Sequence, residues 1–158
     1  MPLRTGSPMP ELTGATDWRN GRVSRESLLI SPTLVHFWSL SCSICKNNLP
    51  RLQEWKESYS PKGLKVVAIH MPREEDETDI TRVETALQLF SILEPCAIDN
   101  EHKLADAFGN DQAWVPYYFL FDGEGNLKSR GAGQAAADLL GDALARLFPE
   151  NETNDYKT

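Results

Sequence analysis

The sequence predicts a single α/β domain in which helices flank a mixed central β-sheet. Short apolar runs alternate with segments of helical periodicity along the chain, as strands joined by helices do. The early runs at 33–38 and 64–69 are almost continuously apolar, which is typical of strands in a buried parallel sheet. A tight turn at 122–126 instead joins the last two strands as an antiparallel pair, so the sheet is expected to be mixed.

The N-terminal half begins with an extended lead-in at 1–10. Asn20-Gly21 is a strong hairpin-turn signal and predicts an N-terminal β-hairpin. Ser24 is a suitable cap for a short helix, and Pro50 is expected to kink a longer one because it removes a backbone hydrogen bond. The elements of this half are expected at 11–23 (hairpin), 24–30 (helix), 33–38 (strand), 43–59 (helix) and 64–69 (strand).

The C-terminal half contains an inserted helix with an apolar face, then short strands and a final helix. Gly109 and Pro149 follow the residues at which two of these helices are expected to end. The last helix is expected to bury Leu139, Leu140, Ala143, Leu144 and Leu147. The elements are expected at 78–91 (inserted helix), 96–98 (strand), 101–108 (helix), 117–121 (strand), 127–131 (strand) and 134–148 (helix). We expect one domain over 1–149 and a polar, disordered tail over 150–158.

Composition excludes several classes of protein. With a net charge of −7 and no cluster of Lys or Arg, neither nucleic acid nor an anionic membrane is an expected partner. Three cysteines, an odd number, argue against a secreted scaffold stapled by disulfides. Residues 1–10 lack an apolar stretch of signal-peptide length, and no segment approaches the roughly 20 apolar residues that span a bilayer. We therefore expect a cytoplasmic protein.

The most informative motif is Cys42-Ser43-Ile44-Cys45, which directly follows the strand at 33–38 and opens the helix at 43–59. A helix N-terminus stabilises a thiolate through its unpaired N–H groups and its dipole. This position makes Cys42 the candidate nucleophile. Cys45, expected to be the more buried of the two, is the candidate resolving thiol of a dithiol–disulfide exchange.

A zinc site is the alternative interpretation of the cysteine pair. Zinc sites of this kind need two further ligands, usually a second close pair. The remaining candidate ligands are scattered along the chain: His36, His70, Cys96 and His102. We therefore expect no metal, and we expect the lone Cys96 to be an inert core residue.

The motif FWSLSCSIC, with Pro50 five residues after its second cysteine and Val115-Pro116 before YYFLFD, resembles the thioredoxin fold. The expected N-terminal hairpin and inserted helix resemble the TlpA/ResA-like bacterial thiol–disulfide oxidoreductases. The segment PTLVHFWSLSCSICK, followed by VVAIHMPREED, is similar to soluble YkuV-type members of Gram-positive bacilli. The resemblance covers about residues 9 to 148. It implies an enzyme whose only redox group is the Cys42–Cys45 pair, with no added cofactor.

The resemblance also implies roles for residues around the pair. Trp38 is expected to pack under the active-site turn. Pro116 is expected to follow a cis peptide bond from Val115 and to face the cysteines, which would let the backbone of Val115 pair with a substrate segment. The alternative is a trans proline at the start of an edge strand. Trp114 either forms an apolar platform for substrate or is simply buried.

Several positions depart from the family pattern. Ser43 and Ile44 stand in place of Gly-Pro, and the intervening dipeptide affects the redox poise. His36 stands six residues before Cys42, where many thioredoxins carry a buried acid that assists proton transfer at the second cysteine, and Asn48 replaces a glutamate of some TlpA/ResA-like members. His36 is either a proton relay or a buried histidine satisfied by a backbone partner.

The resulting functional hypothesis is a bacterial, cytoplasmic enzyme that reduces protein disulfides. We expect a monomer that is regenerated by an electron donor such as a reductase. The alternatives are a thiol oxidant or isomerase of the same fold, a peroxidase, and a metal-binding or partner-binding module. A peroxidase would carry a Pro-x-x-x-Thr/Ser-x-x-Cys signature, and that arrangement does not precede Cys42.

Overall fold

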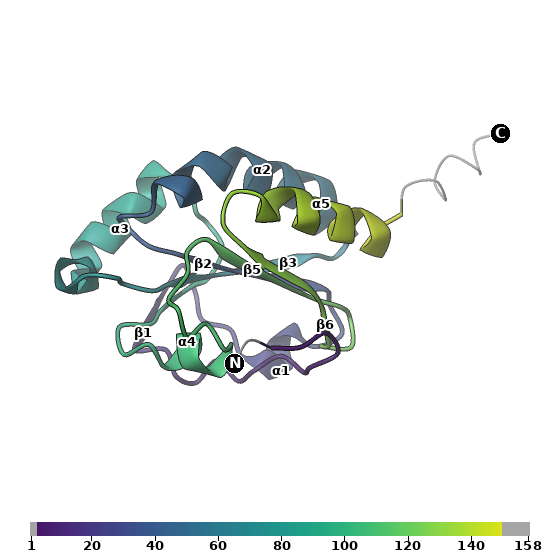
Figure 1. The fold of residues 1–158 in the computed structure, drawn as a ribbon, viewed down its shortest axis with the longest axis horizontal. Coiled ribbons are helices and arrows are strands. Elements are labelled where there is room, and N and C mark those ends of the chain that lie inside the picture. Colours follow the sequence, from purple (N-terminus) through teal and green to yellow (C-terminus); the bar gives the residue numbers. More distant parts are fainter. Residues whose placement is uncertain (1–2, 150–158) are drawn as a thin grey trace.

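Six strands form one sheet, in the order β1-β4-β3-β2-β5-β6, in the computed structural model, which describes residues 3–149. Helices α2, α3 and α5 cover one face of the sheet, and α1 and α4 cover the other (Figure 1). The predicted tail at 150–158 lies outside the described residues. The elements are β1 (Asp17–Arg19), α1 (Arg25–Leu28), β2 (Thr33–Trp38), α2 (Ser43–Tyr59), β3 (Lys65–His70), α3 (Ile80–Leu89), β4 (Cys96–Ile98), α4 (Lys103–Ala107), β5 (Tyr117–Phe121), β6 (Leu127–Ala132) and α5 (Ala136–Leu147).

The sheet is mixed, as the sequence predicts. Strands β2, β3 and β4 run parallel to one another, and β5 and β6 pair as an antiparallel hairpin. Strand β2 lies between β3 and β5, and all six of its residues are buried. The active-site motif follows directly on this central strand.

Side chains of β2 alternate between two hydrophobic cores. Val35 and Phe37 face the core under α1 and α4, whereas Leu34 and Trp38 face the helices α2, α3 and α5. His36 shares the second face with Leu34 and Trp38. A histidine in the middle of the central strand is therefore placed under the long helix that begins at the cysteine pair.

The prediction of an N-terminal β-hairpin is wrong. β1 pairs antiparallel with β4, and within residues 3–149 no second strand returns from β1 to pair with it. Asn20 and Gly21 do adopt the two positive φ angles of a tight turn, 65° and 113°. The chain does not come back alongside β1, because the Asn20 side chain donates to the carbonyls of Ile92 and Glu94 and Ser24 then caps α1.

Further details differ from expectation, and helices α3, α4 and α5 are each shorter than the segments expected for them. Helix α1 ends at Leu28, so it is shorter than the expected segment 24–30. Leu139 in α5 is 48% exposed and Leu147 is half-buried, whereas Leu140, Ala143 and Leu144 are buried. The helical spacing places Leu139 beside the buried stripe and not within it. Pro50 lies inside helix α2, which continues to Tyr59, and the kink expected there stays a prediction.

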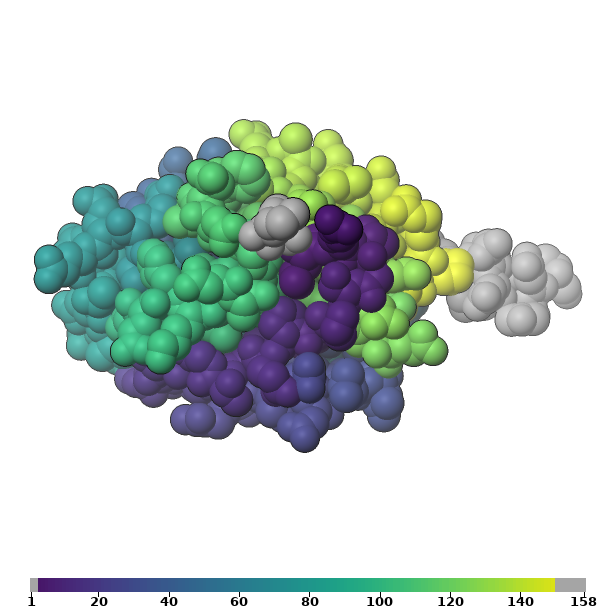
Figure 2. Space-filling model, turned by 60° about the horizontal axis from the view of Figure 1, so that its bottom comes forward, coloured from purple at the N-terminus to yellow at the C-terminus, as the bar shows by residue number. Residues whose placement is uncertain are grey.

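The N-terminal segment covers the face that carries α1 and α4. Figure 2 shows this segment, in purple, lying between α4 and the turn that joins β5 to β6. Pro8 forms an isolated bridge to Asn126, and the amide of Met9 donates to the carbonyl of Gly125. Met9 and Leu12 are buried in the core of this face. Within residues 3–149, none of the helices has the length and apolar character needed to cross a bilayer.

Candidate active site

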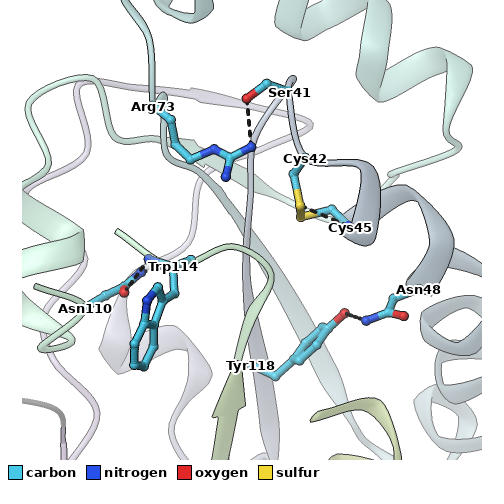
Figure 3. The surroundings of a disulfide bond; sticks show 8 residues. All are labelled: Ser41, Cys42, Cys45, Asn48, Arg73, Asn110, Trp114 and Tyr118. Carbon is cyan, nitrogen blue, oxygen red and sulfur yellow. Dashed lines mark hydrogen bonds between the residues drawn. A yellow bond between two sulfur atoms is a disulfide. The ribbon is translucent and has the colours of Figure 1, made fainter. Parts of the chain in front are cut away.

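The two cysteines of the motif are joined by a disulfide at the start of α2 (Figure 3). Their Cα atoms are 5.3 Å apart. Cys42 is the N-cap of the helix, and its Sγ accepts a hydrogen bond of 3.0 Å from the amide of Cys45. The reactive pair therefore occupies the first turn, where unpaired N–H groups and the helix dipole stabilise negative charge on sulfur.

The expectation that Cys45 is the more buried cysteine is wrong. Cys42 is 3% exposed and Cys45 is 7% exposed. Both cysteines pack in one apolar cluster with Trp38, and the sulfur of Cys42 lies against the amide of Cys45. Ser43 is exposed and Ile44 is half-buried between them. The assignment of Cys42 as nucleophile thus depends on its N-cap position and not on exposure.

Trp38 packs in one buried apolar cluster with Cys42 and Cys45. Its ring meets the ring of His70 edge-on, with centroids 4.8 Å apart. Cys96 is buried in the same cluster, and burial raises the pKa of its thiol to about 12. This environment fits the inert core thiol expected from the sequence. Among residues 3–149, no group of three or more His, Cys, Asp or Glu side chains converges to hold a metal.

The loop that leads into β5 lies opposite the cysteines. The Val115–Pro116 peptide bond is cis, and Pro116 lines the same small cavity as Cys45. Asn110 holds the preceding turn, since its side chain accepts from the amide of Trp114 at 2.9 Å and donates to the carbonyl of Trp114 at 3.0 Å. Trp114 is 52% exposed, so simple burial is excluded. Figure 3 shows this indole directed away from the disulfide.

Arg73 follows β3 and is not among the site residues expected from the sequence. Its Nη2 donates to the hydroxyl of Ser41 at 2.9 Å, so a guanidinium lies beside the residue that precedes Cys42 (Figure 3). Ser41 stands where thioredoxins have tryptophan, and a hydroxyl at this position accepts the arginine where an indole would not. The sequence alone does not indicate that Ser41 and Arg73 are partners.

Asn48 and Tyr118 form a buried polar pair between α2 and β5. The Asn48 amide donates to the tyrosine hydroxyl at 3.0 Å. Burial raises the pKa of Tyr118. The position at which some relatives carry a glutamate is thus occupied by a neutral hydrogen-bonding pair.

His36 has a charged partner and not the backbone partner that was the alternative to a proton relay. The distance between its Nε2 and Oε2 of Glu94 is 2.7 Å, and Oε1 of Glu94 accepts from Nζ of Lys56 at 2.8 Å. Both side chains of the His36–Glu94 pair are buried. Burial opposes ionisation of Glu94, but the hydrogen bond and charge of His36, together with Lys56, outweigh it and lower the carboxyl pKa to about 2.

The sequence did not point to Glu94 because it is distant in sequence from His36. The pairing of β2 with β3 and of β3 with β4 brings the two residues together. His36 is in register with Ala68 on β3, and Ala68 is in register with Cys96 on β4. Glu94 stands in the loop two residues before Cys96, and its carboxylate reaches His36 from there. Only the order of the strands, which the sequence does not give, would have pointed to it.

Comparisons with known proteins agree with this geometry. Residues 5–130 match the sequence profile of the AhpC/TSA family. The chain is 40% identical over 151 residues to the thiol-disulfide oxidoreductase YkuV of Bacillus subtilis (strain 168), covering 95% of this chain and all of that one. It is 24% identical to the thiol-disulfide oxidoreductase ResA of Bacillus thuringiensis (strain Al Hakam), covering 93% of this chain and 80% of that one.

A solved structure shows the same fold. The solution structure of a thioredoxin-like protein in the oxidized form is 40% identical and superposes with a TM-score of 0.82. The match covers 92% of this chain and 97% of the other. The fold that the cysteine, Pro50 and Val115-Pro116 motifs predict is confirmed.

Proposed function

The chain belongs to the AhpC/TSA family, as a thiol–disulfide oxidoreductase with the thioredoxin-like fold, and from this premise we propose that it reduces protein disulfides through Cys42 and Cys45. The observation that carries the proposal is the disulfide in the first turn of α2, beside the cis Val115–Pro116 loop. When the pair is reduced, the helix N-terminus stabilises the thiolate form of a cysteine at this position.

The reaction proceeds in two exchanges. The thiolate of Cys42 attacks one sulfur of a substrate disulfide, forms a mixed disulfide and releases the other substrate sulfur as a thiolate, which takes a proton from solvent. Cys45 then loses its proton and attacks Cys42, which releases the second substrate thiol. Two electrons pass from the dithiol to the substrate, and the enzyme is left with the Cys42–Cys45 disulfide.

Substrate recognition is assigned to the surface around the pair. An extended segment can align with the backbone of Val115, next to Pro116, as strand-like peptides do at exposed edges. The exposed Ser43 and half-buried Ile44 lie where such a segment would pass. Trp114 offers an exposed apolar surface farther from the sulfurs, so its contact would be with residues flanking the substrate disulfide.

The reducing direction goes together with a cytoplasmic location, because thiols are kept reduced there. Regeneration then requires a dithiol donor such as a reductase, and we propose that the enzyme works as a monomer. The relatives YkuV and ResA named above come from Bacillus species, which supports a bacterial source.

The decisive experiment traps the intermediate. The reduced Cys45→Ser variant is expected to accumulate a mixed disulfide with a disulfide-containing substrate such as insulin. The Cys42→Ser variant is expected to form none. Cys96→Ala serves as the matched control, because its thiol is buried and it is expected to turn over like the wild type. Trapping through Cys42→Ser, or none through Cys45→Ser, would contradict the assignment of roles.

The direction is tested by the equilibrium of the couple with glutathione. A potential near about −270 mV supports a reductant, and one near about −120 mV supports the alternative of a thiol oxidant or isomerase. A peroxidase on this fold is the remaining enzymatic alternative. Consumption of hydrogen peroxide that depends on Cys42 and outpaces insulin reduction would favour it.

A further inference from the structure

An arginine side chain from the loop after β3 lies beside the catalytic motif. Nη2 of Arg73 donates to the hydroxyl of Ser41 at 2.9 Å, and Ser41 directly precedes Cys42 (Figure 3). Arg73 therefore contacts the motif one residue away from the cysteine that attacks the substrate. Both Arg73 and Ser41 are exposed, so a substrate held at Cys42 has access to the guanidinium.

The backbone that carries Arg73 is anchored before and after this residue. The amide of Met71 donates to the carbonyl of the last residue of β2 at 2.9 Å, and the amide of Arg73 donates to Oε1 of the buried Glu77 at 3.2 Å. Nε2 of His102 lies 2.6 Å from the carbonyl oxygen of the buried Pro72. A cation on an anchored backbone, with its head group held by a hydroxyl, loses less conformational freedom when it binds a ligand than a free side chain would.

The guanidinium of Arg73 retains donors for an anion. An arginine carries five N–H donors, and the hydroxyl of Ser41 accepts from one nitrogen of this group. Among residues 3–149, no carboxylate forms an ion pair with Arg73, and Asp76 in the acidic segment that follows pairs with Arg82 at 2.9 Å. The planar fork of a guanidinium matches the two oxygens of a carboxylate, so a carboxylate is the ligand that this group favours.

The turn that carries Trp114 is fixed to the same loop. The side-chain amide of Asn110, which bonds to the carbonyl of Trp114, also lies 3.8 Å from the sulfur of Met71. Met71 stands two residues before Arg73, so one buried side chain joins the two segments. A substrate segment that aligns with the backbone of Val115 is therefore offered an apolar surface by one segment and a cation by the other.

We propose that Arg73, held by Ser41, is a specificity-determining residue that binds a carboxylate on the substrate, next to the disulfide that Cys42 attacks. The inference rests on the proposed function and names its substrate class, which is proteins in which an acidic residue flanks a disulfide-bonded cysteine. The carboxylate forms a charge-assisted pair with the guanidinium while the thiolate of Cys42 attacks the neighbouring sulfur. Ser41 is a positioning residue, because its hydroxyl acts through the guanidinium that it orients.

Lys46, near the start of α2, is a second basic residue close to the cysteine pair. Its Nζ lies 5.4 Å from the centre of the Phe90 ring at the end of α3. Lys46 thus approaches a different element from Arg73, which lies against Ser41. Because both basic residues are exposed, Lys46→Gln removes the same charge as Arg73→Gln and provides the matched control.

The test measures how fast the reduced enzyme attacks three peptides of one sequence, in which the residue next to a cysteine is glutamate, glutamine or lysine. A disulfide joins this cysteine to the neutral pyridine-2-thiol, which is released when Cys42 bonds to the peptide sulfur. We expect Arg73→Gln to lower the ratio of the glutamate to the glutamine rate constant by about fivefold, the size of a favourable exposed ion pair. Arg73→Glu is expected to make the lysine peptide the fastest of the three.

The salt concentration is chosen so that contacts dominate over distant charge. The net charge of −7 and the exposed Glu74 and Glu75 disfavour an acidic peptide at long range. Rates are therefore compared at about 0.15 M ionic strength, where the Debye length is about 8 Å. Ser41→Ala keeps the charge of Arg73 but not its fixed position, and Arg73→Lys keeps the charge but not the planar fork, so each is expected to lower the ratio in part.

The ratio distinguishes recognition of the substrate from an effect on the cysteine. If Arg73 acted only by stabilising the thiolate of Cys42, Arg73→Gln would slow all three peptides by the same factor, and the unchanged ratio would overturn the inference. An equal fall of the ratio in Lys46→Gln would overturn it as well. In both cases the proposed function would stand. Attack at the wild-type rate by Cys42→Ser would instead overturn the proposed function itself.

Discussion

His70 is the last residue of β3, and its ring supports Trp38 beneath the disulfide. Neither of its ring nitrogens has a hydrogen-bond partner among residues 3–149, and the side chain is fully buried. Burial therefore favours the neutral ring and lowers the His70 pKa to about 4, although the charge of Glu77 raises it. A buried base of this kind makes the support under the active site sensitive to acid.

We expect His70→Leu to flatten the pH dependence of stability between about pH 6.5 and pH 4. In the wild type the unfolded chain binds a proton at His70 below about pH 6.5, whereas the folded chain binds it only near a pKa of about 4. The free energy of unfolding therefore falls across this window, by on the order of 3 kcal/mol, and leucine has no proton to bind. Urea unfolding at both ends of the window measures the change. An equally steep fall in His70→Leu would contradict the expectation.

At the scale of elements, the side chain of Asn110 fixes the loop between α4 and β5, which carries the Val115–Pro116 peptide bond. Asn110 is buried and makes two hydrogen bonds to the backbone of Trp114, directly before Val115. This pair of bonds substitutes for regular secondary structure in a loop that must keep a defined shape. The side chain of Asn110 thus fixes the backbone of the loop that faces the cysteines.

We expect Asn110→Ala to lower the free energy of unfolding by about 1–3 kcal/mol, because two backbone groups lose their partner. The KM for reduction of insulin should rise, while trapping of the mixed disulfide at saturating substrate remains. Asn110→Asp keeps the acceptor for the Trp114 amide but loses the donor to its carbonyl, so an intermediate KM is expected. A KM unchanged in Asn110→Ala would show that the loop keeps its shape without this residue.

Elements whose signals are local were predictable from the sequence. β2, β4 and β5 were predicted at their observed residues, because apolar runs and flanking turns define a buried strand. The hairpin at Asn20-Gly21 failed because the turn signal fixes the two turn residues but not what the following chain pairs with. Glu94 and Arg73 escaped prediction for a related reason, since the contacts that place them cross between strands and loops distant in sequence.

At the scale of the whole molecule, the row of His36, Glu94 and Lys56 ties the central strand to α2 and to the loop before β4. Its carboxylate has a pKa of about 2, well below that of an unfolded glutamate. A carboxyl group of lowered pKa contributes stability above its unfolded pKa and loses it as pH falls toward the folded value. The tertiary structure should therefore weaken in acid partly through this single row.

We expect the free energy of unfolding to fall less between about pH 5 and pH 2 in Glu94→Gln than in the wild type, by on the order of 3 kcal/mol. The variant starts from a lower stability near neutral pH, because His36 and Lys56 lose their shared partner. Urea unfolding at each pH gives the two slopes, with Asp138→Asn as the exposed-carboxylate control. Parallel curves for Glu94→Gln and wild type would show that the row does not govern acid sensitivity.

The hydrogen bond from the amide of Cys45 to the sulfur of Cys42 has a practical consequence for spectroscopy. This N–H group touches the atom whose covalent partner changes at every stage of turnover. Its resonance in a nitrogen-15 correlation spectrum is therefore expected at a different position in each of three states. These are the dithiol, the mixed disulfide with substrate and the Cys42–Cys45 disulfide. One peak of the isotope-labelled protein therefore follows the catalytic cycle without an attached fluorophore.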